Sequence, residues 1–290
     1  MAIKEEHAEH HYAISALCKL SNVTRAAYYK WLHRQPSFKE HENIMIVEKI
    51  ESIHSESPDK GYRRIRDDLD RYYDIHVNDK RVLRICRIQN IKSTIKYCNK
   101  GCTRHASRPQ YVAENLLDRD FTATAPNEKW LTDVTEFKYY LGSEVHKVYL
   151  SAILDLYDRR IVSFAIRDRN DNILVFDTFT KAVASNPDAH PLLHSDRGYQ
   201  YTSRTFHTKL IAAGMIHSMS RVGKCIDNGP MEGFWGILKR ERYYGHRFTD
   251  KESLVKMIEN YIEYYNTKRL QRKLGVLTPM EKHARYWFVA

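Results

Sequence analysis

Three acidic residues stand among apolar or aromatic neighbours, at places where a folded chain would expose a carboxylate rather than bury it. They are Asp133 in WLTDVTEF, Asp196 in HSDRGYQYTS and Glu232 in DNGPMEGFWGILKRE. Phosphoryl transfer on DNA uses two divalent ions about 3.5 to 4 Å apart, one activating the attacking oxygen and the other stabilising the leaving oxygen. Mg²⁺ prefers oxygen ligands and keeps much of its water, so three carboxylates are enough to hold such ions.

Each carboxylate is weak evidence alone, because a lone Asp at a strand edge is more often solvated or a capping group. Carboxylates that cluster without a metal raise the pKa of at least one member, and bound ions remove that cost. Asp155 in ILDLYDRR is a fourth acid on a core strand, where we expect it to serve the structure or to support the metal ligands rather than to bind metal. His194 and Ser195 are adjacent on a strand and would point to opposite faces, which argues against a Ser/His nucleophile pair.

The segment after Pro126 has the pattern of short strands. Strands are expected in KWLTDVTEFKYY, HKVYLSAILDLYD and RRIVSFAIRD, and the turn residues between them predict an antiparallel meander. The predicted continuation is a helix at about 172–185, a strand in PLLHSD, a helix at about 203–213, a strand in IHSMS, and helices at about 230–244 and 251–266. This βββαβαβ order predicts an α/β fold with the first acid on the first strand, the second after the fourth strand and the third on a late helix.

The first hundred residues have helical periodicity. Residues 11–34 predict a helix-turn-helix, and a further helix is expected at about 44–54. The segment GYRRIRDDLDRYYDIHVNDKRVLRICRIQNI predicts a second helix-turn-helix, in which the Asn78-Asp79 pair is a natural N-cap for a helix that begins near Lys80. The exposed face of its last helix would carry Arg81, Arg84 and Arg87. A DNA recognition helix has this character, although many basic helices merely face water.

Positive charge is concentrated on either side of a neutral middle. The formal net charge is +11. Residues 60–108 contain 14 Lys/Arg against 5 Asp/Glu, residues 121–235 contain 13 of each, and residues 236–286 contain 12 against 6. Basic arms that neutralise phosphates supply most sequence-independent DNA affinity, so this distribution favours a nucleic-acid partner over two solvated surfaces.

The apolar residues and the cysteines of the sequence indicate the cellular compartment in which the protein is expected. No apolar run approaches the ~20 residues that span a bilayer, and MAIKEEHAEHHYA lacks the apolar core of a signal peptide. The five cysteines are odd in number and scattered, which is typical of reduced thiols. We therefore expect a cytoplasmic protein with no membrane partner.

Taken together, the three acidic motifs resemble the integrase-type core of bacterial insertion-sequence transposases. The resemblance is to the OrfB product of the two-frame (OrfA/OrfB) elements, a relative of retroviral integrases. That family carries two aspartates and a glutamate with 35 residues between the last two, and positions 197–231 number 35 here. It also carries a basic residue seven positions after the glutamate, where this chain has Lys239.

The similarity extends over nearly the whole chain, from about residue 11 to 285. It includes CKLSNVTRAAYYKWLHR, the block GYRRI followed by VNDKRVLRI, and NLLDRDFTATAPNEKW at the junction with the core. Gly229, Gly233 and Trp235 stand where members more often have Ala, Ser and Phe. Because all three carboxylates are retained, these differences would bear on rate or packing rather than on the type of reaction.

The resemblance implies a ribonuclease H-like DDE core that cleaves transposon-end DNA and transfers the cut strand to a target. It implies Mg²⁺ or Mn²⁺, two ions per active site, with Asp133 and Asp196 as direct ligands and Glu232 completing the site. Water or a DNA 3′-hydroxyl would be the nucleophile. Lys239 would contact a phosphate at the transposon end, and Arg197 would contact DNA or only order its loop.

The resemblance also implies partners and a division into domains. The partners are double-stranded DNA of the inverted-repeat ends and target, a second copy of the chain in the DNA complex, and an OrfA product, which can be joined by frameshifting. The expected location is the nucleoid of a bacterial cytoplasm. The expected segments are 1–38 (helix-turn-helix-like), 39–96 (second helical DNA-binding domain), 97–125 (basic linker), 126–247 (catalytic core) and 248–290 (C-terminal basic helical tail).

Two other functions are compatible with these residues. A nuclease of the same fold would hydrolyse DNA or RNA without joining ends, and the two basic arms and the helix from Glu232 to Lys239 count against it. An inactive, domesticated transposase would act as a DNA-binding regulator, and it would bind DNA equally well after Asp196→Asn. Retention of all three carboxylates counts against that regulator.

Overall fold

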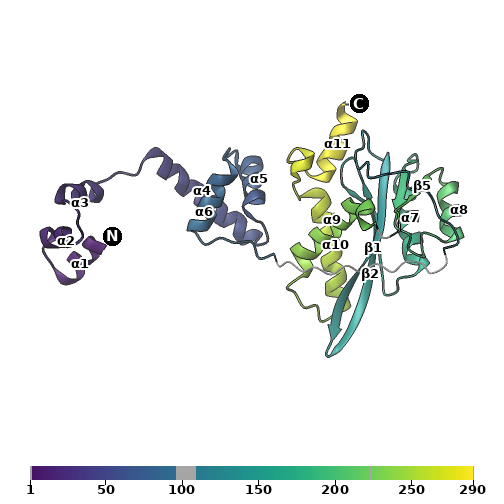
Figure 1. Cartoon of the computed structure of the whole chain (residues 1–290), viewed down its shortest axis with the longest axis horizontal. Coiled ribbons are helices and arrows are strands. Elements are labelled where there is room, and N and C mark those ends of the chain that lie inside the picture. Colours follow the sequence, from purple (N-terminus) through teal and green to yellow (C-terminus); the bar gives the residue numbers. More distant parts are fainter. Residues whose placement is uncertain (1, 96–108, 223, 290) are drawn as a thin grey trace.

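A five-stranded mixed sheet forms the centre of the C-terminal part of the chain (Figure 1). The computed structural model describes residues 2–95, 109–222 and 224–289, in which the strand order is β3-β2-β1-β4-β5. The strands are β1 (Lys129–Leu141), β2 (Glu144–Asp155), β3 (Ile161–Arg167), β4 (Leu192–Ser195) and β5 (Ile216–Met219). The first three pair antiparallel, whereas β1, β4 and β5 run parallel. With α7 (Asn172–Ser185) and α8 (Arg204–Ala212), this confirms the predicted βββαβαβ order.

Helices cover both faces of the sheet because the side chains of β1 alternate between two apolar layers. Leu131 and Phe137 belong to the layer that includes α9 (Gly229–Leu238) and α10 (Lys251–Thr267). Trp130 belongs to the opposite layer, with α7 and α8. All three side chains are fully buried. Asp133 has the same parity as Leu131 and Phe137, so the strand directs it toward the α9 side.

The C-terminal helices correct the predicted tail at 248–290. α10 buries Leu254, Ile258 and Tyr261 in the same cluster as β1 and β2. Their spacing of four and three forms one helical stripe, which is removed from water only by packing on the sheet. A short 3₁₀ turn, η3 (Arg272–Leu274), and α11 (Pro279–Val289) follow. This segment is therefore part of the core domain.

The described part of the predicted linker also lies on the core. Within residues 109–125, Leu117 is buried, and its backbone N–H donates to Ser218 Oγ at 3.0 Å. Tyr111 stacks on His207 with ring centroids 3.7 Å apart. These contacts join the segment to β5 and α8, so the core begins before residue 126. Positions 97–108 of the predicted linker lie outside the described residues.

The N-terminal part consists of two helical units that lie apart in Figure 1. The helices are α1 (Ala2–His10), α2 (Ile14–Leu20), α3 (Arg25–Leu32), α4 (Phe38–Glu56), α5 (Tyr62–Tyr73) and α6 (Asp79–Ile88). The unit α4–α6 has its own core, which includes Ile50, Leu69 and Val82. The predicted N-cap is confirmed, because Asn78 Oδ1 accepts the backbone N–H of Arg81 at 2.8 Å. No helix in the described part of the chain is long and apolar enough to cross a bilayer.

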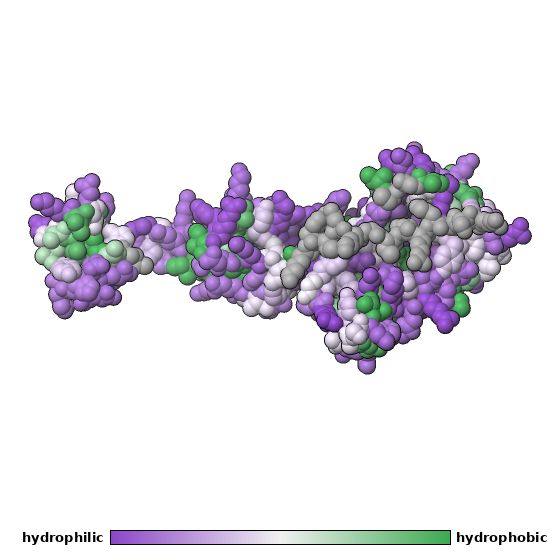
Figure 2. Space-filling view, turned by 60° about the horizontal axis from the view of Figure 1, so that its bottom comes forward, coloured by the Kyte–Doolittle hydropathy of each residue, from purple (hydrophilic) through white to green (hydrophobic). Residues whose placement is uncertain are grey.

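The unit α1–α3 is small and leaves apolar side chains in water. Leu20 is 87 % exposed and Trp31 is 44 % exposed, and Figure 2 shows apolar surface at this end of the molecule. By contrast, Cys18 and Tyr28 are buried at the contact of its helices. The predicted helix-turn-helix over 11–34 therefore forms with a minimal core.

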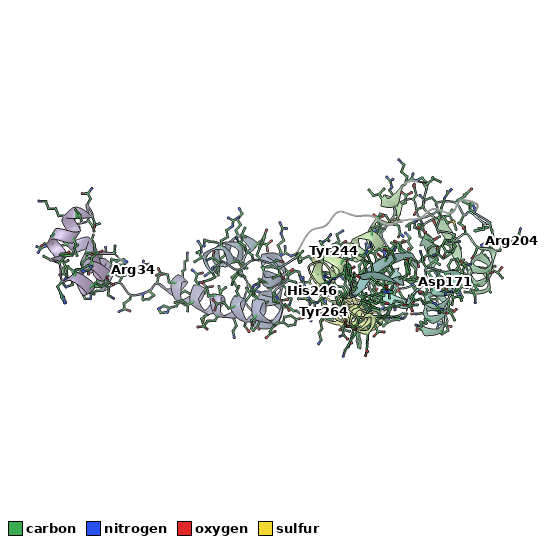
Figure 3. The ribbon with its side chains drawn as sticks, turned by 90° about the horizontal axis from the view of Figure 1, so that it is seen from below. Arg34, Asp171, Arg204, Tyr244, His246 and Tyr264 are labelled. Atoms are coloured by element: carbon green, nitrogen blue, oxygen red, sulfur yellow. The ribbon has the colours of Figure 1, made fainter. Side chains whose placement is uncertain are left out.

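Ion pairs join the unit α4–α6 to the core domain. Arg64 on α5 lies 2.9 Å from Glu241 Oε1, and its Nη2 donates to Tyr264 Oη at 2.7 Å. Figure 3 shows Tyr264 on the edge of the core that faces this unit. Arg272 pairs with Asp67 at 2.9 Å across the same boundary. Glu241 lies in η2 (Lys239–Tyr243), a π-helical turn that continues α9, so the helical unit contacts the same continuous helix that carries Glu232.

Candidate active site

Asp133 is a half-buried carboxylate on β1, and it faces α9. Its Oδ2 accepts a hydrogen bond from Trp235 Nε1 at 3.0 Å. Burial, and then the negative charges of Asp196 and Glu232, raise the pKa of Asp133 to about 8. The three acids therefore share one electrostatic environment, although the sequence separates them widely.

Asp196 follows β4 directly and emerges beside Asp133. Leu131 and His194 are partners in the parallel pairing of β1 with β4. Asp133 and Asp196 each lie two residues further along, so parallel strands deliver both acids to the same end of the sheet. Asp196 Oδ1 also accepts the backbone N–H of Gly198 at 2.8 Å, which orients the carboxylate within its turn.

Glu232 lies in the first turn of α9 and is exposed. The start of this helix is anchored to the first strand, because Asn228 Nδ2 donates to the carbonyl oxygen of Thr132 at 3.0 Å. Thr132 is the residue before Asp133. The backbone of β1 thus fixes where α9 begins, and with it the approach of Glu232 to the two aspartates.

The donor set fits divalent cations. All three groups are carboxylates, which are the ligands preferred by Mg²⁺ and Mn²⁺. The repulsion that raises the pKa of Asp133 is the kind that a cation relieves. Among the described residues, no three His, Cys, Asp or Glu side chains are already arranged as ligands of one ion. The three acids therefore lie near one another, but in the described structure they are not arranged as the ligands of a single ion.

Gly198 sets the position of the Asp196 carboxylate. A Cβ at this position would lie 2.9 Å from Asp196 Oδ1 and 3.1 Å from Gln200 Oε1. Both atoms end flexible side chains, so the backbone would tolerate Gly198→Ala while the carboxylate moved. We expect the rate of DNA cleavage to fall about tenfold to 100-fold, because displacement of a reactive group slows the reaction by this much. The melting temperature should change little. Cleavage rates and thermal unfolding test this.

Gly61→Ala is the matched control for this prediction. Its added Cβ would meet only Ser93 Cβ, at 3.9 Å, which is an ordinary contact. Cleavage at the wild-type rate by Gly198→Ala would mean that the turn does not position Asp196. Unfolding at a much lower temperature would mean that the glycine is needed for the fold instead.

The predicted DNA-contact residues near the acids have structural contacts as well. Lys239 Nζ lies 5.1 Å from the centroid of the Phe137 ring, and Phe137 is four residues beyond Asp133 on the same face of β1. Lys239 therefore lies on the same side of the sheet as the acids, beside a residue that is about 13 Å further along β1 than Asp133. Arg197 Nε donates to the carbonyl oxygen of Ser220 at 2.8 Å, which ties the turn after β4 to the end of β5.

The three arginines predicted to lie on the exposed face of α6 differ in their exposure to solvent. Arg84 and Arg87 are exposed, as predicted. The prediction of an exposed face is wrong for Arg81, which is half-buried. Its Nη2 lies 2.8 Å from Glu42 Oε2, and its Nε donates to Asn43 Oδ1 at 3.0 Å. Arg81 joins α6 to α4 because these acceptors lie on the adjacent helix.

Two features of the site were not predicted from the sequence. Trp235 was noted only as a departure from the family pattern, yet it contacts Asp133. Asp227 is fully buried and accepts hydrogen bonds from Arg221 at 2.8 Å and Arg119 at 2.7 Å, which hold its pKa well below the usual range. It fixes the loop that leads into α9. The DN in DNGPMEGFW was the only available signal, since the partners of Asp227 lie elsewhere in the chain.

Asp155 has a structural role, which is one of the two roles expected for it. It is fully buried, and its carboxylate accepts hydrogen bonds from the backbone N–H groups of Asn127 at 2.7 Å and Tyr157 at 2.8 Å.

The two glycines that depart from the family pattern lie where a side chain could be accommodated. A Cβ at Gly229 or Gly233 would meet no atom within 4 Å, so neither glycine is required by packing.

Known families match three parts of the chain. Two models described as "Integrase core domain" match residues 123–225 and 232–283, and an "HTH-like domain" matches residues 40–97. The solved catalytic core of HTLV-2 integrase in complex with magnesium has 18% sequence identity and a TM-score of 0.44, covering 56% of this chain and 99% of that chain. The sheet order and the matched families define an integrase-core protein, a polynucleotidyl transferase of the DDE type.

Similar individual proteins identify the family of this chain more narrowly than the domain matches do. The putative transposase InsK of IS150 from Escherichia coli is 35% identical over 272 residues, 93% of each chain. The transposase InsF of IS3A from the same organism is 30% identical over 288 residues, covering 96% of this chain and 95% of the relative. A transposase-like protein of Haemophilus influenzae is 42% identical over 206 residues, covering 71% and 93%. The chain belongs to the bacterial insertion-sequence transposases with an integrase core, and it is a DNA transposase.

Proposed function

We propose that Asp133, Asp196 and Glu232 hold two divalent ions, Mg²⁺ or Mn²⁺, for cleavage of transposon ends and strand transfer. The observation that carries this proposal is the geometry of the acids: the parallel pairing of β1 with β4 brings Asp133 and Asp196 to one end of the sheet, and the contact of Asn228 with Thr132 sets the start of the helix that carries Glu232. Carboxylates whose negative charges repel one another destabilise a fold unless a bound cation compensates them. Metal binding is the gain that offsets this cost.

In this proposal each of the three acids has a role in holding the ions. When bound, the ions activate the attacking oxygen and stabilise the leaving oxygen of the phosphodiester. Asp133 and Asp196 supply oxygens from the sheet, and Glu232 supplies an oxygen from α9. Water attacks in cleavage and a DNA 3′-hydroxyl attacks in strand transfer, so no covalent bond to the protein forms.

The proposed DNA contacts follow from position and charge. Lys239 lies over Phe137 on the same side of the sheet as the acids, where a phosphate of the transposon end that flanks the cleaved bond would pass. Exposed Arg84 and Arg87 give α6 a basic surface suited to the DNA backbone or groove. Arg197 orders its turn and stays a candidate contact. Arg81 is assigned a structural role by its pairing with Glu42.

The proposed assembly contains further components. Strand transfer must join two transposon ends to one target, so we propose at least two copies of the chain in the DNA complex. An OrfA product, separate or joined by frameshifting, is proposed to assist end recognition. The substrate would place the protein on the bacterial nucleoid.

A nicking and strand-transfer assay on DNA that carries the ends of the element tests this function. The wild type, with and without OrfA, is compared with Glu232→Gln in Mg²⁺, in Mn²⁺ and in EDTA. Glu259→Gln is the matched control, because Glu259 is an exposed glutamate on α10. We expect metal-dependent joined product from the wild type and the control, and none from Glu232→Gln.

The other outcomes separate the alternatives. Metal-dependent cleavage without joining, even of precut ends, would favour a nuclease of the same fold. Tight DNA binding that is indifferent to Glu232→Gln, with no product under any condition, would favour a DNA-binding regulator. Joined product from Glu232→Gln at the wild-type rate would remove Glu232 from the site.

A further inference from the structure

Trp235 makes a polar contact that its apolar surroundings do not require. The side chain is 6 % exposed and belongs to the cluster between α9 and the sheet. Its ring centroid lies 5.1 Å from that of Phe234. Phenylalanine would supply much of the same apolar packing, but it has no N–H. The indole Nε1 instead donates to Asp133 Oδ2 at 3.0 Å.

This contact joins the two elements that carry the proposed ligands. Trp235 is three residues after Glu232, so both side chains lie on one side of α9. Asp133 comes from β1, 102 residues earlier in the chain. One hydrogen bond therefore fixes the orientation of the Asp133 carboxylate and also the register of the Glu232 helix against that strand.

The geometry leaves room for ligation. A carboxylate has two oxygens with about four lone-pair sites, and the indole N–H uses one of these on Oδ2. Oδ1 receives no hydrogen bond from Trp235. Metal ligands are commonly held in this way, and loss of the supporting group typically weakens metal binding 10- to 100-fold.

We propose that Trp235 is a positioning residue for the metal site, which holds the Asp133 carboxylate and the Glu232 helix in the geometry that binds divalent ions. This inference rests on the proposed function of Asp133. It makes Trp235 the support of a ligand, and it assigns no contact with DNA or with the ion to the indole.

Binding of Mn²⁺ alone to the full chain, without DNA, tests the inference. Free Mn²⁺ is measured by electron paramagnetic resonance across a titration of wild type, Trp235→Phe and Asp133→Asn. We expect Trp235→Phe to bind Mn²⁺ 10- to 100-fold more weakly than wild type. Asp133→Asn is expected to lose the site.

Two further variants separate positioning from packing. A chain with 3-benzothienylalanine at position 235 keeps the bicyclic shape and replaces the N–H by sulfur, so it should bind Mn²⁺ as weakly as Trp235→Phe. Trp130→Phe is the matched control, because Trp130 Nε1 donates to Asp155 Oδ2 at 3.3 Å, outside the site. Its Mn²⁺ affinity should equal that of wild type.

The possible failures are distinguishable. Wild-type Mn²⁺ affinity in Asp133→Asn would overturn the proposed metal site itself. Loss of binding in Asp133→Asn together with unchanged affinity in the benzothienyl variant would overturn only the role of Trp235. An equal loss in Trp130→Phe would also overturn it, because the effect would then reflect general destabilisation.

Discussion

Asp133→Asn is expected to abolish DNA cleavage and strand transfer and, at the same time, to stabilise the metal-free protein. Loss of a proposed ligand should lower the rate by at least about 10³-fold, which corresponds to roughly 4 kcal/mol of transition-state stabilisation. The amide keeps an oxygen that can accept the hydrogen bond from Trp235. It cannot ionise, so it avoids the penalty that burial and the charges of Asp196 and Glu232 impose on an ionisable group at this position.

The gain in stability follows from the direction of the pKa shift. The pKa of Asp133 is raised from 3.8 to about 8, first by burial and then by its acidic neighbours. Above pH 3.8 the unfolded chain releases this proton while the native protein retains it, so the penalty grows as the pH rises and is complete above about 8. At pH 7 we expect Asp133→Asn to raise the free energy of unfolding by about 2 to 4 kcal/mol.

Chemical denaturation at pH 7 and pH 5, without divalent ions, measures this gain. The difference between variant and wild type should shrink at pH 5, because the penalty in the wild type is smaller there. Asp177→Asn is the control, since Asp177 is paired with Arg167 on the surface and its loss should change stability by under about 1 kcal/mol. A variant that is both inactive and less stable than wild type would indicate that Asp133 serves the fold.

Glu241→Gln is expected to destabilise the protein by about 3 to 5 kcal/mol, because it removes the anion from a buried cluster of cations. The Glu241 side chain is 4% exposed and lies 2.8 Å from Arg269 and 2.9 Å from Arg64. Burial favours its protonated form, but the two arginines outweigh burial and hold the pKa of Glu241 below its usual value. The glutamine would remove the counter-charge of Arg269 and leave Arg64 with Asp59 alone, 3.0 Å away.

Denaturant unfolding of Glu241→Gln measures this loss. Asp168→Asn is the control, because it breaks the exposed pair of Lys251 with Asp168, in which both side chains are about half exposed. Such surface pairs contribute between 0 and about 1 kcal/mol. Since Arg64 belongs to α5, the variant should also weaken the contact between the helical unit and the core domain. A loss below about 1 kcal/mol would mean that solvent reaches the cluster and replaces the lost charge.

The order of the helices and strands and the three proposed metal-binding acids could be predicted from the sequence, because both depend on short local patterns of residues. Alternation over 129–155 and turn residues predicted the meander, and helical periodicity predicted α7 and α8. The motifs around Asp196 and Glu232, with their family-like spacing, predicted through the resemblance which acids are the proposed metal ligands. The helix that begins after Asn78 was predicted from its apolar stripe and from the capping pair that precedes it.

Only the tertiary structure decided which side chains support those acids. Trp235 and Asp133 are 102 residues apart, and no pattern along the chain links them. The same is true of Arg81 and Glu42, whose pairing removes one arginine from the predicted basic face. The stripe of α10 was visible in the sequence, but a stripe does not say which surface will cover it. Periodicity and motif spacing therefore determined what chemistry this chain can perform, and long-range packing determined which residues hold it in place.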